Sequence, residues 1–445
     1  MTEEESFDAI IVGAGPAGTT AAYVLAKAGL SVALLERGSS PGSKNVFGGI
    51  LYTTVLGRLL PDFVEEAPLE RHIKGIKIYL ISPDNALSIG VESEDHNKPP
   101  YNNSFTVSRA KFDQWYASKA EEAGAMLVPE TVVDDLIKDD KGKVVGVRVR
   151  GEEGELYSKV VIVADGVNSL LAEKAGLRKN FVPRQVSLGM KEVIELPRSV
   201  IEDRFGLTGN EGVELKYMAG DATKGIWGGG NIYTNRESLS LVSWLALEPL
   251  MHSGLKATDI FEQFKEHPFV RNYVRDGKVV EYQAHLAPDG GYDDTPKYFA
   301  DGVLVCGDAA RFLNASIHYE GTNFAMASGE AAANTVLEAS RTKDFSAVSL
   351  SRYEKLLEES FVMKDLKRYR KMNHFAEKNP EFFGPYFNVL TQTAVDFFAV
   401  KEMPKRTQEW QMIKDFRKNL KKATGSRFPL LAFIWKSIKG AFSFI

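Results

Sequence analysis

A glycine-rich turn between a predicted strand and a predicted helix constrains this chain more than any other feature. The turn follows an apolar run and carries three glycines in the spacing GxGxxG: Gly13, Gly15 and Gly18. In such a unit the first glycine makes the tight turn, and the second lets a pyrophosphate approach the backbone. The third lets the helix pack closely on the strand, and the helix N-terminus stabilises the phosphate charge.

An acidic residue follows at the distance that this motif requires. The apolar run 32–35 ends in Glu36, about 20 residues after the glycines, where an acid accepts hydrogen bonds from a ribose. Because strand, turn, helix and acid are in register, the sequence predicts a dinucleotide-binding unit; the alternative is a purely structural glycine turn. The predicted contacts are Gly13, Ala14, Gly15, Pro16, Ala17, Gly18, Glu36 and Arg37.

Composition narrows the class of protein. The 445 residues are enough for two or three domains, and a net charge of -4 gives no nucleic-acid signature. The single cysteine, Cys306, excludes an internal disulfide and a cysteine-ligated cluster within the chain. An acidic N-terminal segment and the lack of a run of about 18 uncharged apolar residues predict a cytoplasmic protein without a signal peptide or spanning helix.

Three later segments favour FAD over NAD as the dinucleotide. Arg109 stands at the start of a predicted helix, where a guanidinium can pair with a pyrophosphate. The apolar run 160–163 leads into Asp165 and Gly166, which predict a sharp turn under the cofactor. Another predicted strand ends in Gly307 and Asp308, and a carboxylate there can bind the hydroxyls of a ribityl chain, which NAD lacks.

These pieces, in this order and at these separations, resemble the FAD-binding fold of the p-hydroxybenzoate hydroxylase and geranylgeranyl reductase type. The resemblance covers roughly residues 5–340. It implies that Glu36 holds the adenosine ribose, Arg109 the pyrophosphate and Asp308 the ribityl chain.

Residues 36–52 sharpen the resemblance. The acid is followed by a Pro-Gly turn and then by Lys44, Asn45, Gly48 and Gly49. This segment is similar to the FixC (EtfC) branch of the electron-transfer-flavoprotein:quinone oxidoreductases, and the similarity runs through to the C-terminal helices. In that family the segment passes near the isoalloxazine ring, which implies flavin contacts for these four residues.

One departure from the family pattern bears on partners. The long members carry a C-terminal ferredoxin-like portion with a cysteine-ligated [4Fe–4S] cluster, which a chain with one cysteine cannot hold. The FixC branch lacks that portion and obtains its cluster from a separate small subunit. The resemblance therefore implies a ferredoxin-like iron–sulfur partner.

The cofactor motifs divide the chain into three parts. Residues 1–75, 106–180 and 290–345 are expected to form a discontinuous, Rossmann-like α/β FAD-binding domain. Residues 76–105 and 181–289 are expected to form a mostly antiparallel capping sheet, with strands near 213–218 and 239–247 and a turn over 225–231. Residues 346–445 are expected to be helical, with loops near residues 379–380 and 384–385.

A helix rich in small residues is predicted to begin near residue 320. The family fold points its N-terminus at the pyrimidine side of the flavin, where its partial positive charge favours the anionic reduced ring. Gly321, Thr322 and Asn323 are the expected contacts, although a closely packed core helix gives the same pattern. His285 and His318 are weaker candidates, for the flavin face and for a quinone path.

The C-terminal tail differs in charge from the rest. Residues 401–445 hold 11 Lys/Arg against three Asp/Glu, and on a helix Leu431, Ile434, Trp435, Ile438 and Phe442 share one face, with Lys436, Lys439 and Ser443 off it. This pattern is typical of a helix at a membrane interface or on a partner, although packing on its own domain is an alternative.

No triad, paired-carboxylate site or metal cluster is apparent, so we assign no catalytic side chain and no metal ligand and expect the flavin to supply the chemistry. The leading hypothesis is an FAD-containing subunit that accepts electrons from an electron transfer flavoprotein and passes them toward membrane quinone. It would lie on the inner face of the cell membrane. Its complex is expected either to bifurcate electrons between two acceptors or to pass them to quinone alone. The alternatives are a self-contained reductase or monooxygenase of the geranylgeranyl reductase type, and a non-enzymatic flavin-bearing scaffold or redox sensor.

Overall fold

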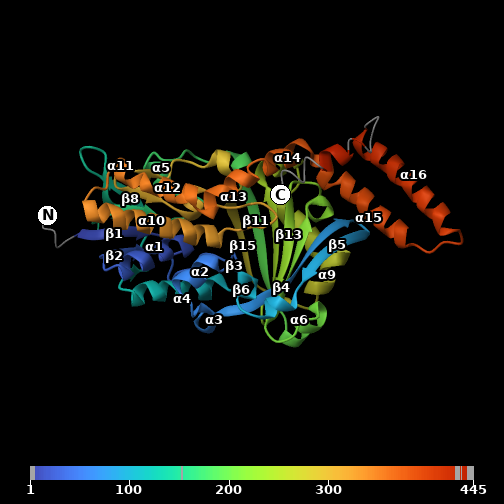
Figure 1. Ribbon diagram of the computed structural model, residues 1–445, viewed down its shortest axis with the longest axis horizontal. Helices are drawn as coiled ribbons and strands as arrows, with labels where there is room; N and C mark the ends of the chain where they lie inside the picture. The colour runs from blue at the N-terminus through green and yellow to red at the C-terminus, as the bar shows by residue number, and fades with distance from the viewer. Residues whose placement is uncertain (1–5, 152–153, 426–430, 432, 438–445) are drawn as a thin grey trace. The chain divides into compact units, whose positions relative to one another are not determined.

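The computed structural model describes residues 6–151, 154–425, 431 and 433–437 (Figure 1). The chain forms two compact units. Unit 1 comprises Met1–Glu70, Asn103–Val186 and Leu286–Tyr369, and unit 2 comprises Arg71–Asn102, Ser187–His285 and Arg370–Ile445. Each unit is built from separate stretches of sequence, and each is described here by itself. The functional division into an FAD-binding domain, a cap and a helical C-terminal region stays a prediction.

Unit 1 is built on a sheet whose strands run in the order β16-β17-β10-β1-β2-β7. The pairs β1–β10, β1–β2, β10–β17 and β2–β7 are parallel, and β8 and β9 extend the sheet beside β10. A short antiparallel pair, β3 with β6, belongs to the same unit. The strands are β1 (Ser6–Val12), β2 (Val32–Leu35), β3 (Ile50–Tyr52), β6 (Ser104–Val107), β7 (Met126–Val128), β8 (Val133–Lys138), β9 (Val144–Val149), β10 (Glu155–Val163), β16 (Phe299–Ala300) and β17 (Val303–Val305).

The central strands of unit 1 are continuous apolar runs because both of their faces are buried. Residues 9–12, 32–35, 160–163 and 303–305 are all buried, which is the pattern of a parallel sheet covered by helices. The helices are α1 (Pro16–Lys27), α2 (Thr54–Leu59), α3 (Phe63–Glu66), α4 (Arg109–Glu122), α5 (Leu170–Lys174), α10 (Thr322–Thr342), α11 (Ala347–Leu350), α12 (Arg352–Glu359) and α13 (Phe361–Tyr369).

Small residues let α1 and α10 pack closely. A Cβ atom on Gly329 of α10 would lie 2.1 Å from the carbonyl oxygen of Ala17 in α1. The hydroxyl of Ser328, on the same helix, accepts a 2.9 Å hydrogen bond from the backbone N–H of Gly307. The small-residue pattern of this helix is therefore a packing feature, as one of the two interpretations of the sequence held.

Unit 2 contains a sheet in the order β15-β11-β14-β13-β12-β4, with β5 also paired to β4. Its pairs are antiparallel in β11–β14, β13–β14, β12–β13 and β4–β5, and parallel in β4–β12. The strands are β4 (Leu69–Ser82), β5 (Asn85–Glu92), β11 (Val186–Glu195), β12 (Glu211–Met218), β13 (Gly228–Thr234), β14 (Ser238–Ala246) and β15 (Lys278–Pro288). The strands expected near 213–218 and 239–247 are thus confirmed as β12 and β14.

One expectation in this sheet is wrong. Residues 228–231, expected to belong to a turn that begins at Gly225, are the first residues of β13. Large aromatic side chains cover this part of the strand: a Cβ on Gly229 would lie 2.9 Å from the indole nitrogen of Trp244, and one on Gly230 would lie 2.4 Å from the ring of Phe264. These glycines therefore mark close packing within a strand rather than a turn.

The helices of unit 2 pack around this sheet and continue toward the C-terminus. They are α6 (Arg198–Phe205), α7 (Leu247–Ser253), α8 (Ala257–Lys265), α9 (Pro268–Val274), α14 (Met372–Lys378), α15 (Pro385–Phe398) and α16 (Lys405–Thr424). The apolar side chains of Phe375, Phe383 and Phe387 form one buried cluster with Trp227. The predicted helical character of residues 346–425, with breaks near 379–380 and 384–385, is confirmed.

The tail is only partly described. Residues 431 and 433–437 are helical, and the ring of Phe433 packs against Tyr386 and Phe416 at centroid distances of 5.2 and 5.9 Å. Leu431, Ile434 and Trp435 are exposed. The other members of the predicted face, Ile438 and Phe442, and its flanking Lys439 and Ser443, lie outside the described residues. In the part of the chain that is described, no helix is both long and apolar enough to cross a bilayer.

Candidate functional site

Four strand ends in unit 1 lie at one edge of the sheet. The register pairs Val12 with Leu35, Val12 with Val163, and Val163 with Val305. Each of these residues is the last of its strand, so the four following loops begin side by side. These loops carry the glycine turn, Glu36, Asp165 and Asp308, which are the cofactor residues predicted from sequence. In open parallel sheets this carboxyl edge is where ligands bind.

The glycine turn has the geometry that its three glycines imply. Gly13 has φ +103°, and a Cβ there would lie 2.4 Å from the carbonyl oxygen of Ala164. A Cβ on Gly18 would lie 2.0 Å from the carbonyl oxygen of Gly13, so the helix is packed directly on the turn. Gly15 differs, because no protein atom lies within 4 Å of the position of its Cβ. The open space is therefore at the glycine expected to face the pyrophosphate.

The first turn of α1 is open to an anion. Gly15 is the N-cap residue, Pro16 follows at the first helical position, and no described side chain caps this end. A helix N-terminus carries unpaired N–H groups and a partial positive charge. Ala17 lies deeper, where its Cβ would be 3.0 Å from one built on Gly307.

Glu36 ties the acid loop to the glycine turn. Its carboxylate accepts hydrogen bonds from the backbone N–H of Ala14 at 3.0 Å and of Gly38 at 2.7 Å. The side chain is half-buried at the end of β2. The carboxylate is therefore fixed beside the turn, as a ribose-binding acid requires. Arg37, the next residue, is exposed.

Arg109 is buried in a bidentate ion pair that sequence reasoning missed. Its Nε and Nη2 donate to the Asp113 carboxylate at 2.8 and 2.7 Å, one helical turn further along α4. Its Nη1 donates to the carbonyl oxygen of Phe47 at 2.9 Å. A Cβ on Gly48 would lie 2.7 Å from the same Nη1 and 3.4 Å from the hydroxyl of Thr322. The Arg-x-x-x-Asp spacing was the available signal for Asp113.

The segment near residue 45 is partly organised by its own hydrogen bonds. The Asn45 side-chain oxygen accepts from the backbone N–H of Phe47 at 3.0 Å, and the carbonyl of Gly49 accepts from Val107 at 2.8 Å. Lys44 is exposed and Gly49 is buried. The structure thus brings Gly48, Arg109 and Thr322 together, while it places Lys44 on the surface.

Asp308 is a predicted site residue whose carboxyl is desolvated. It is the second residue of the short helix η7 (Gly307–Ala310), which follows β17, and Gly307 has φ +63°. Desolvation raises the pKa of Asp308 to about 6, although the positive charge of Arg109 lowers it. Among the described residues, none donates a hydrogen bond to this carboxylate. A desolvated carboxyl without donors suits a ligand that brings hydroxyl groups.

The start of α10 holds the other predicted flavin contacts. Gly321 is the N-cap residue, and Thr322 is the first helical residue and is buried. The Asn323 side chain donates to Glu320 at 2.6 Å and accepts from Thr54 and the backbone of Val55. Asn323 therefore links α10 to the start of α2. Both the oxygen and the nitrogen of its side-chain amide have protein partners.

A buried arginine that the sequence did not single out joins two of the cofactor loops. Nη1 of Arg178 donates to the carbonyl oxygens of Val167 and Ala309 at 3.0 and 3.3 Å, and Nη2 donates to that of Asn168 at 2.6 Å. Two of these carbonyls follow the turn at Asp165–Gly166, and the third follows Asp308. We call Arg178 with its three carbonyl partners the arginine clasp.

Phe181 supports the clasp from one side. The guanidinium of Arg178 lies 4.5 Å from the centre of its ring, and that of Arg311 lies 4.9 Å from the same ring. Both arginines are buried, and desolvation lowers the pKa of each. An aromatic ring shared by two guanidinium groups offsets part of the cost of burying them.

The structure also places the turn at Asp165–Gly166, Cys306 and the two candidate histidines. Burial raises the pKa of Asp165, and its Oδ1 has no hydrogen-bond partner among the described residues. Gly166 has φ +79° with open space at its Cβ position.

Cys306 is buried, and desolvation raises the pKa of its thiol, which opposes a reactive thiolate. His285 lies in β15 of unit 2, and the backbone carbonyl of His318 accepts from the Tyr52 hydroxyl at 2.8 Å.

The residues of this edge fit FAD. The open space at Gly15 beside the uncapped start of α1 suits a pyrophosphate. The Glu36 carboxylate beside the turn suits a ribose, and the Asp308 carboxyl, which has no donor, suits the hydroxyls of a ribityl chain. When bound, the flavin supplies the redox chemistry.

Comparisons with known proteins agree with this class of site. Residues 1–68 match the Thi4 family, and residues 372–443 match the ETF-QO/FixC family C-terminal domain. The Protein FixC of Bradyrhizobium diazoefficiens is 43% identical over 417 residues, covering 93% of this chain and 95% of that protein. The Protein FixC of Escherichia coli (strain K12) is 44% identical over 398 residues, covering 89% and 91%.

A solved structure shares the fold. A geranylgeranyl bacteriochlorophyll reductase-like protein from Thermoplasma acidophilum superposes with a TM-score of 0.70 at 21% identity, covering 94% of this chain and 99% of that one. Fold, site and comparisons together define an FAD-dependent oxidoreductase of α/β class. Within that class, the chain belongs to the ETF-QO/FixC family and is an oxidoreductase linked to an electron transfer flavoprotein.

The pKa of Asp308 predicts a pH dependence of stability. Because the folded chain binds this proton more tightly than the unfolded chain, stability falls as the pH rises from about 4 to about 6. We expect Asp308→Asn to remove this loss. At pH 7.5 the flavin-free variant should be about 1–3 kcal/mol more stable than the natural chain, whereas at pH 4.5 the two should be about equally stable. Denaturant unfolding at the two pH values measures the difference. The exposed Asp293→Asn is the control, and equal pH dependence of Asp308→Asn and the natural chain would contradict the assignment.

The arginine clasp predicts a large effect from a residue outside the motifs. Arg178→Met leaves three carbonyl oxygens without their donor, so we expect a loss of about 2–4 kcal/mol in stability. The matched change Arg148→Met removes an exposed ion pair with Glu155 and is expected to cost less than about 1 kcal/mol. Thermal unfolding of both variants decides the matter, and similar losses would show that the clasp is unimportant.

Proposed function

We propose that this chain is the FAD-containing subunit of an electron-transfer-flavoprotein:quinone oxidoreductase complex. It accepts electrons from an electron transfer flavoprotein and passes them toward membrane quinone. The observation that carries the proposal is the match to FixC relatives over nearly the full length of both sequences. The C-terminal family domain over residues 372–443 supports the quinone side of the route.

A ferredoxin-like iron–sulfur subunit is part of the proposed complex. The 445 residues contain one cysteine, Cys306, and it lies buried in unit 1. A [4Fe–4S] cluster takes four cysteine ligands. A cluster on the electron route therefore has to come from another chain.

The predicted site residues take the following roles in this proposal. Gly13, Gly15 and Gly18 form the pyrophosphate turn, and Glu36 binds the adenosine ribose. Asp308 binds the ribityl chain. Arg109, held by Asp113, adds positive charge near the phosphates and near Asp308. Gly48, Gly49 and the start of α10 lie along the isoalloxazine ring, with the N-terminal dipole of α10 favouring its anionic reduced form.

Attachment to the inner face of the membrane is also proposed. The basic tail has exposed apolar side chains at Leu431, Ile434 and Trp435, while Phe433 packs on its own unit. These features support a peripheral contact through the tail. Residues 428–445 are the segment whose removal tests it.

Cofactor placement is tested by Asp308→Ala and Glu36→Ala. Loss of a hydrogen bond between a carboxylate and a ligand hydroxyl costs about 1.5–3 kcal/mol, which is about a ten- to hundredfold loss of FAD affinity. Equilibrium dialysis with fluorescence detection of FAD measures it, and Asp293→Ala is the matched surface control. Full flavin retention by both site variants would show that the placement is wrong.

The electron route is tested by anaerobic stopped-flow mixing. Reduced electron transfer flavoprotein is expected to bleach the flavin of this chain, and a quinone analogue is expected to reoxidise it when the iron–sulfur subunit is present. Oxidation of NADPH by the chain alone would instead support a self-contained reductase of the geranylgeranyl reductase type. An intact flavin that accepts electrons from no donor would support the scaffold or sensor alternative. Addition of oxidised ferredoxin as a second acceptor tests bifurcation.

A further inference from the structure

Two buried arginines of unit 1 lie against one aromatic ring. Arg178 and Arg311 are each 6% exposed, and their guanidinium groups lie 4.5 and 4.9 Å from the centre of the Phe181 ring. In the described part of the chain neither arginine forms an ion pair with a carboxylate, and the Nε–H group of each has no acceptor. Carbonyl oxygens and a ring replace only part of the hydration of two cations. We call Arg178 and Arg311 the guanidinium pair.

The acidic groups around the guanidinium pair do not cancel its positive charge. The acids that act on it are Asp165, Glu173 and Asp294. The Asp294 carboxylate accepts hydrogen bonds from another arginine, Arg184, at 3.1 and 3.3 Å. Burial raises the pKa of Asp165, which favours its neutral form. After desolvation, the charge of Arg311 is the next cause that lowers the pKa of Arg178, and its effect is larger than that of either acid on Arg178.

The backbone of Arg311 has a conformation that is uncommon for an arginine. Its φ of +62° lies in the left-handed region, which glycine adopts more readily than residues with a Cβ. The backbone N–H donates to the carbonyl oxygen of Asp308 at 2.9 Å, and Nη1 donates to that of Asp294 at 3.0 Å. Backbone strain of this kind is concentrated at functional sites, where the surrounding structure holds a residue in place.

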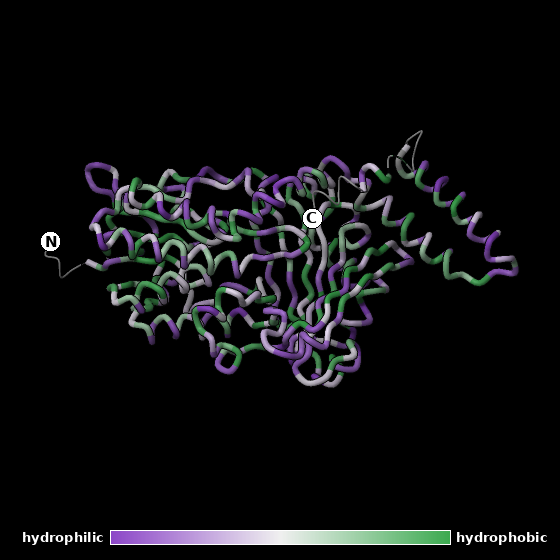
Figure 2. Tube along the Cα trace, in the orientation of Figure 1, coloured by the Kyte–Doolittle hydropathy of each residue, from purple (hydrophilic) through white to green (hydrophobic). Residues whose placement is uncertain are grey.

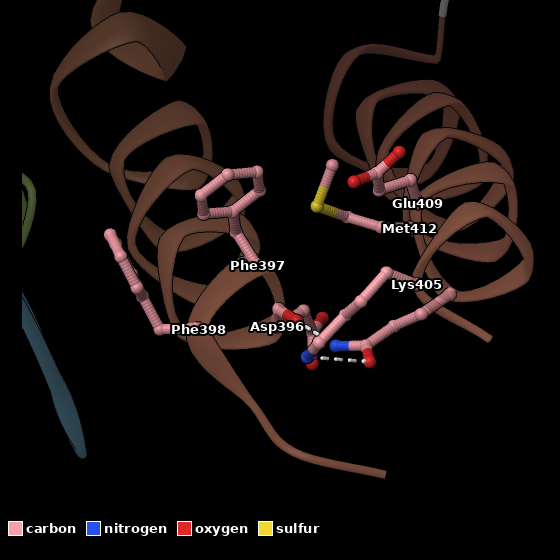
Figure 3. A pocket seen from close by; sticks show the side chains of 7 residues that line it. Asp396, Phe397, Phe398, Lys405, Glu409 and Met412 are labelled. Atoms are coloured by element: carbon pink, nitrogen blue, oxygen red, sulfur yellow. Dashed lines mark hydrogen bonds between the residues drawn. The ribbon is translucent and has the colours of Figure 1, made fainter. Parts of the chain in front are cut away.

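Lys405 in unit 2 shows a more usual environment for a positive charge. It begins α16, along which hydrophobic positions are interspersed among hydrophilic ones (Figure 2). Its side chain lines a cavity of about 270 Å³ between α15 and α16, together with the acidic Asp396 and Glu409 (Figure 3). Lys405 is exposed, so water and nearby carboxylates stabilise its charge. The guanidinium pair is instead removed from water.

The hydrogen bonds of Arg178 place the guanidinium pair beside the loops assigned to the ribityl side of the cofactor. Arg178 donates to the carbonyl oxygens of Val167 and Asn168, which follow the buried Asp-Gly turn. It also donates to the carbonyl oxygen of Ala309, the residue after Asp308. These loops are distinct from the glycine turn and the start of α1, which suit the pyrophosphate. A buried positive charge at this place favours the ligand state that carries more negative charge.

We propose that the guanidinium pair stabilises the additional negative charge of the reduced flavin and thereby raises its reduction potential. Two electrons from the reduced electron transfer flavoprotein and one proton from solvent convert the oxidised ring to its anionic reduced form, which adds one negative charge. The pair acts through its electric field, so neither arginine is a catalytic residue. The inference rests on the proposed function, because that function places the ribityl chain at Asp308.

The expected size of the effect follows from Coulomb's law. A unit charge acting over about 10 Å in a medium with an effective dielectric constant of about 20 changes an equilibrium by about tenfold. Each arginine is therefore expected to favour two-electron reduction by about tenfold, which corresponds to about 30 mV. This effect differs from loop support, because a lysine supplies the same charge but lacks the planar fork that bonds the carbonyl oxygens of the arginine clasp.

The test is the reduction potential of the full-length flavin-loaded chain, measured by anaerobic titration with dithionite against reference dyes. Arg178→Gln and Arg311→Gln each remove one positive charge, and we expect the equilibrium constant for two-electron reduction to fall about tenfold in each. Arg178→Lys keeps the charge and is expected to retain the natural potential. Arg148→Gln removes an exposed arginine of unit 1 that pairs with Glu155, and it is the matched control, expected to leave the potential unchanged.

Thermal unfolding and FAD affinity separate the charge effect from other roles. Arg178→Lys and Arg178→Gln should both unfold at a lower temperature than the natural chain, whereas only Arg178→Gln should change the potential. By thermodynamic linkage, a lower potential requires that Arg178→Gln bind reduced FAD about tenfold more weakly relative to oxidised FAD. If Arg178 served the pyrophosphate instead, both redox states would lose affinity equally and the potential would not move.

Three results would overturn the inference. They are an unchanged potential in both glutamine variants, an equal shift in Arg178→Lys and Arg178→Gln, and an equal loss of affinity for oxidised and reduced FAD. Arg311→Gln keeps the test open where Arg178→Gln does not fold. Because dithionite supplies the electrons, the potentials are measured without the electron transfer flavoprotein. A flavin that shows the expected shifts but accepts no electrons from that protein would contradict the proposed function while supporting this inference.

Discussion

The common register of four parallel strands is the constraint on which this site depends. Val12, Leu35, Val163 and Val305 end their strands at neighbouring positions, although they come from distant parts of the sequence. The register brings the glycine turn and the three acidic loops to one edge, although these loops are far apart in the sequence. Because the strands are buried on both faces, a slip of one residue would displace a whole loop from the site and leave apolar groups mispaired. The chemistry of the edge therefore rests on the packing of the core.

Two kinds of polar group occur at this edge, and they have different physical roles. Arg109 and Arg178 each make several hydrogen bonds to protein partners, so they hold loops in place and contribute charge. Asp308 has no donor among the described residues and a raised pKa, so it carries an unfavourable desolvation free energy in the flavin-free chain. A ligand that brings hydroxyl groups relieves this cost, which couples cofactor binding to stability.

The grouping of the four loops at one edge could be predicted from the sequence because their motifs are local, while their contacts with FAD stay a prediction. Gly13 and Gly18 are required by backbone contacts that GxGxxG encodes directly, and Asp308 follows a clear apolar strand. Arg178 was missed because its partners are backbone carbonyls, which leave no trace in residue identity. Residues 228–231 were mistaken for a turn because a glycine in a sequence can indicate either a positive φ or a close contact with another side chain. At Gly229 the reason is the close contact with Trp244.

Hydrogen–deuterium exchange of the chain with and without FAD tests the central claim most directly. If the four strand ends form one cofactor site, FAD should slow exchange together in peptides that cover residues 13–19, 36–45, 165–171 and 307–311. The peptide that covers the turn at residues 399–404, far along the sequence from every cofactor loop, should be unaffected. Protection confined to one of the four segments, or protection found only in unit 2, would contradict the account.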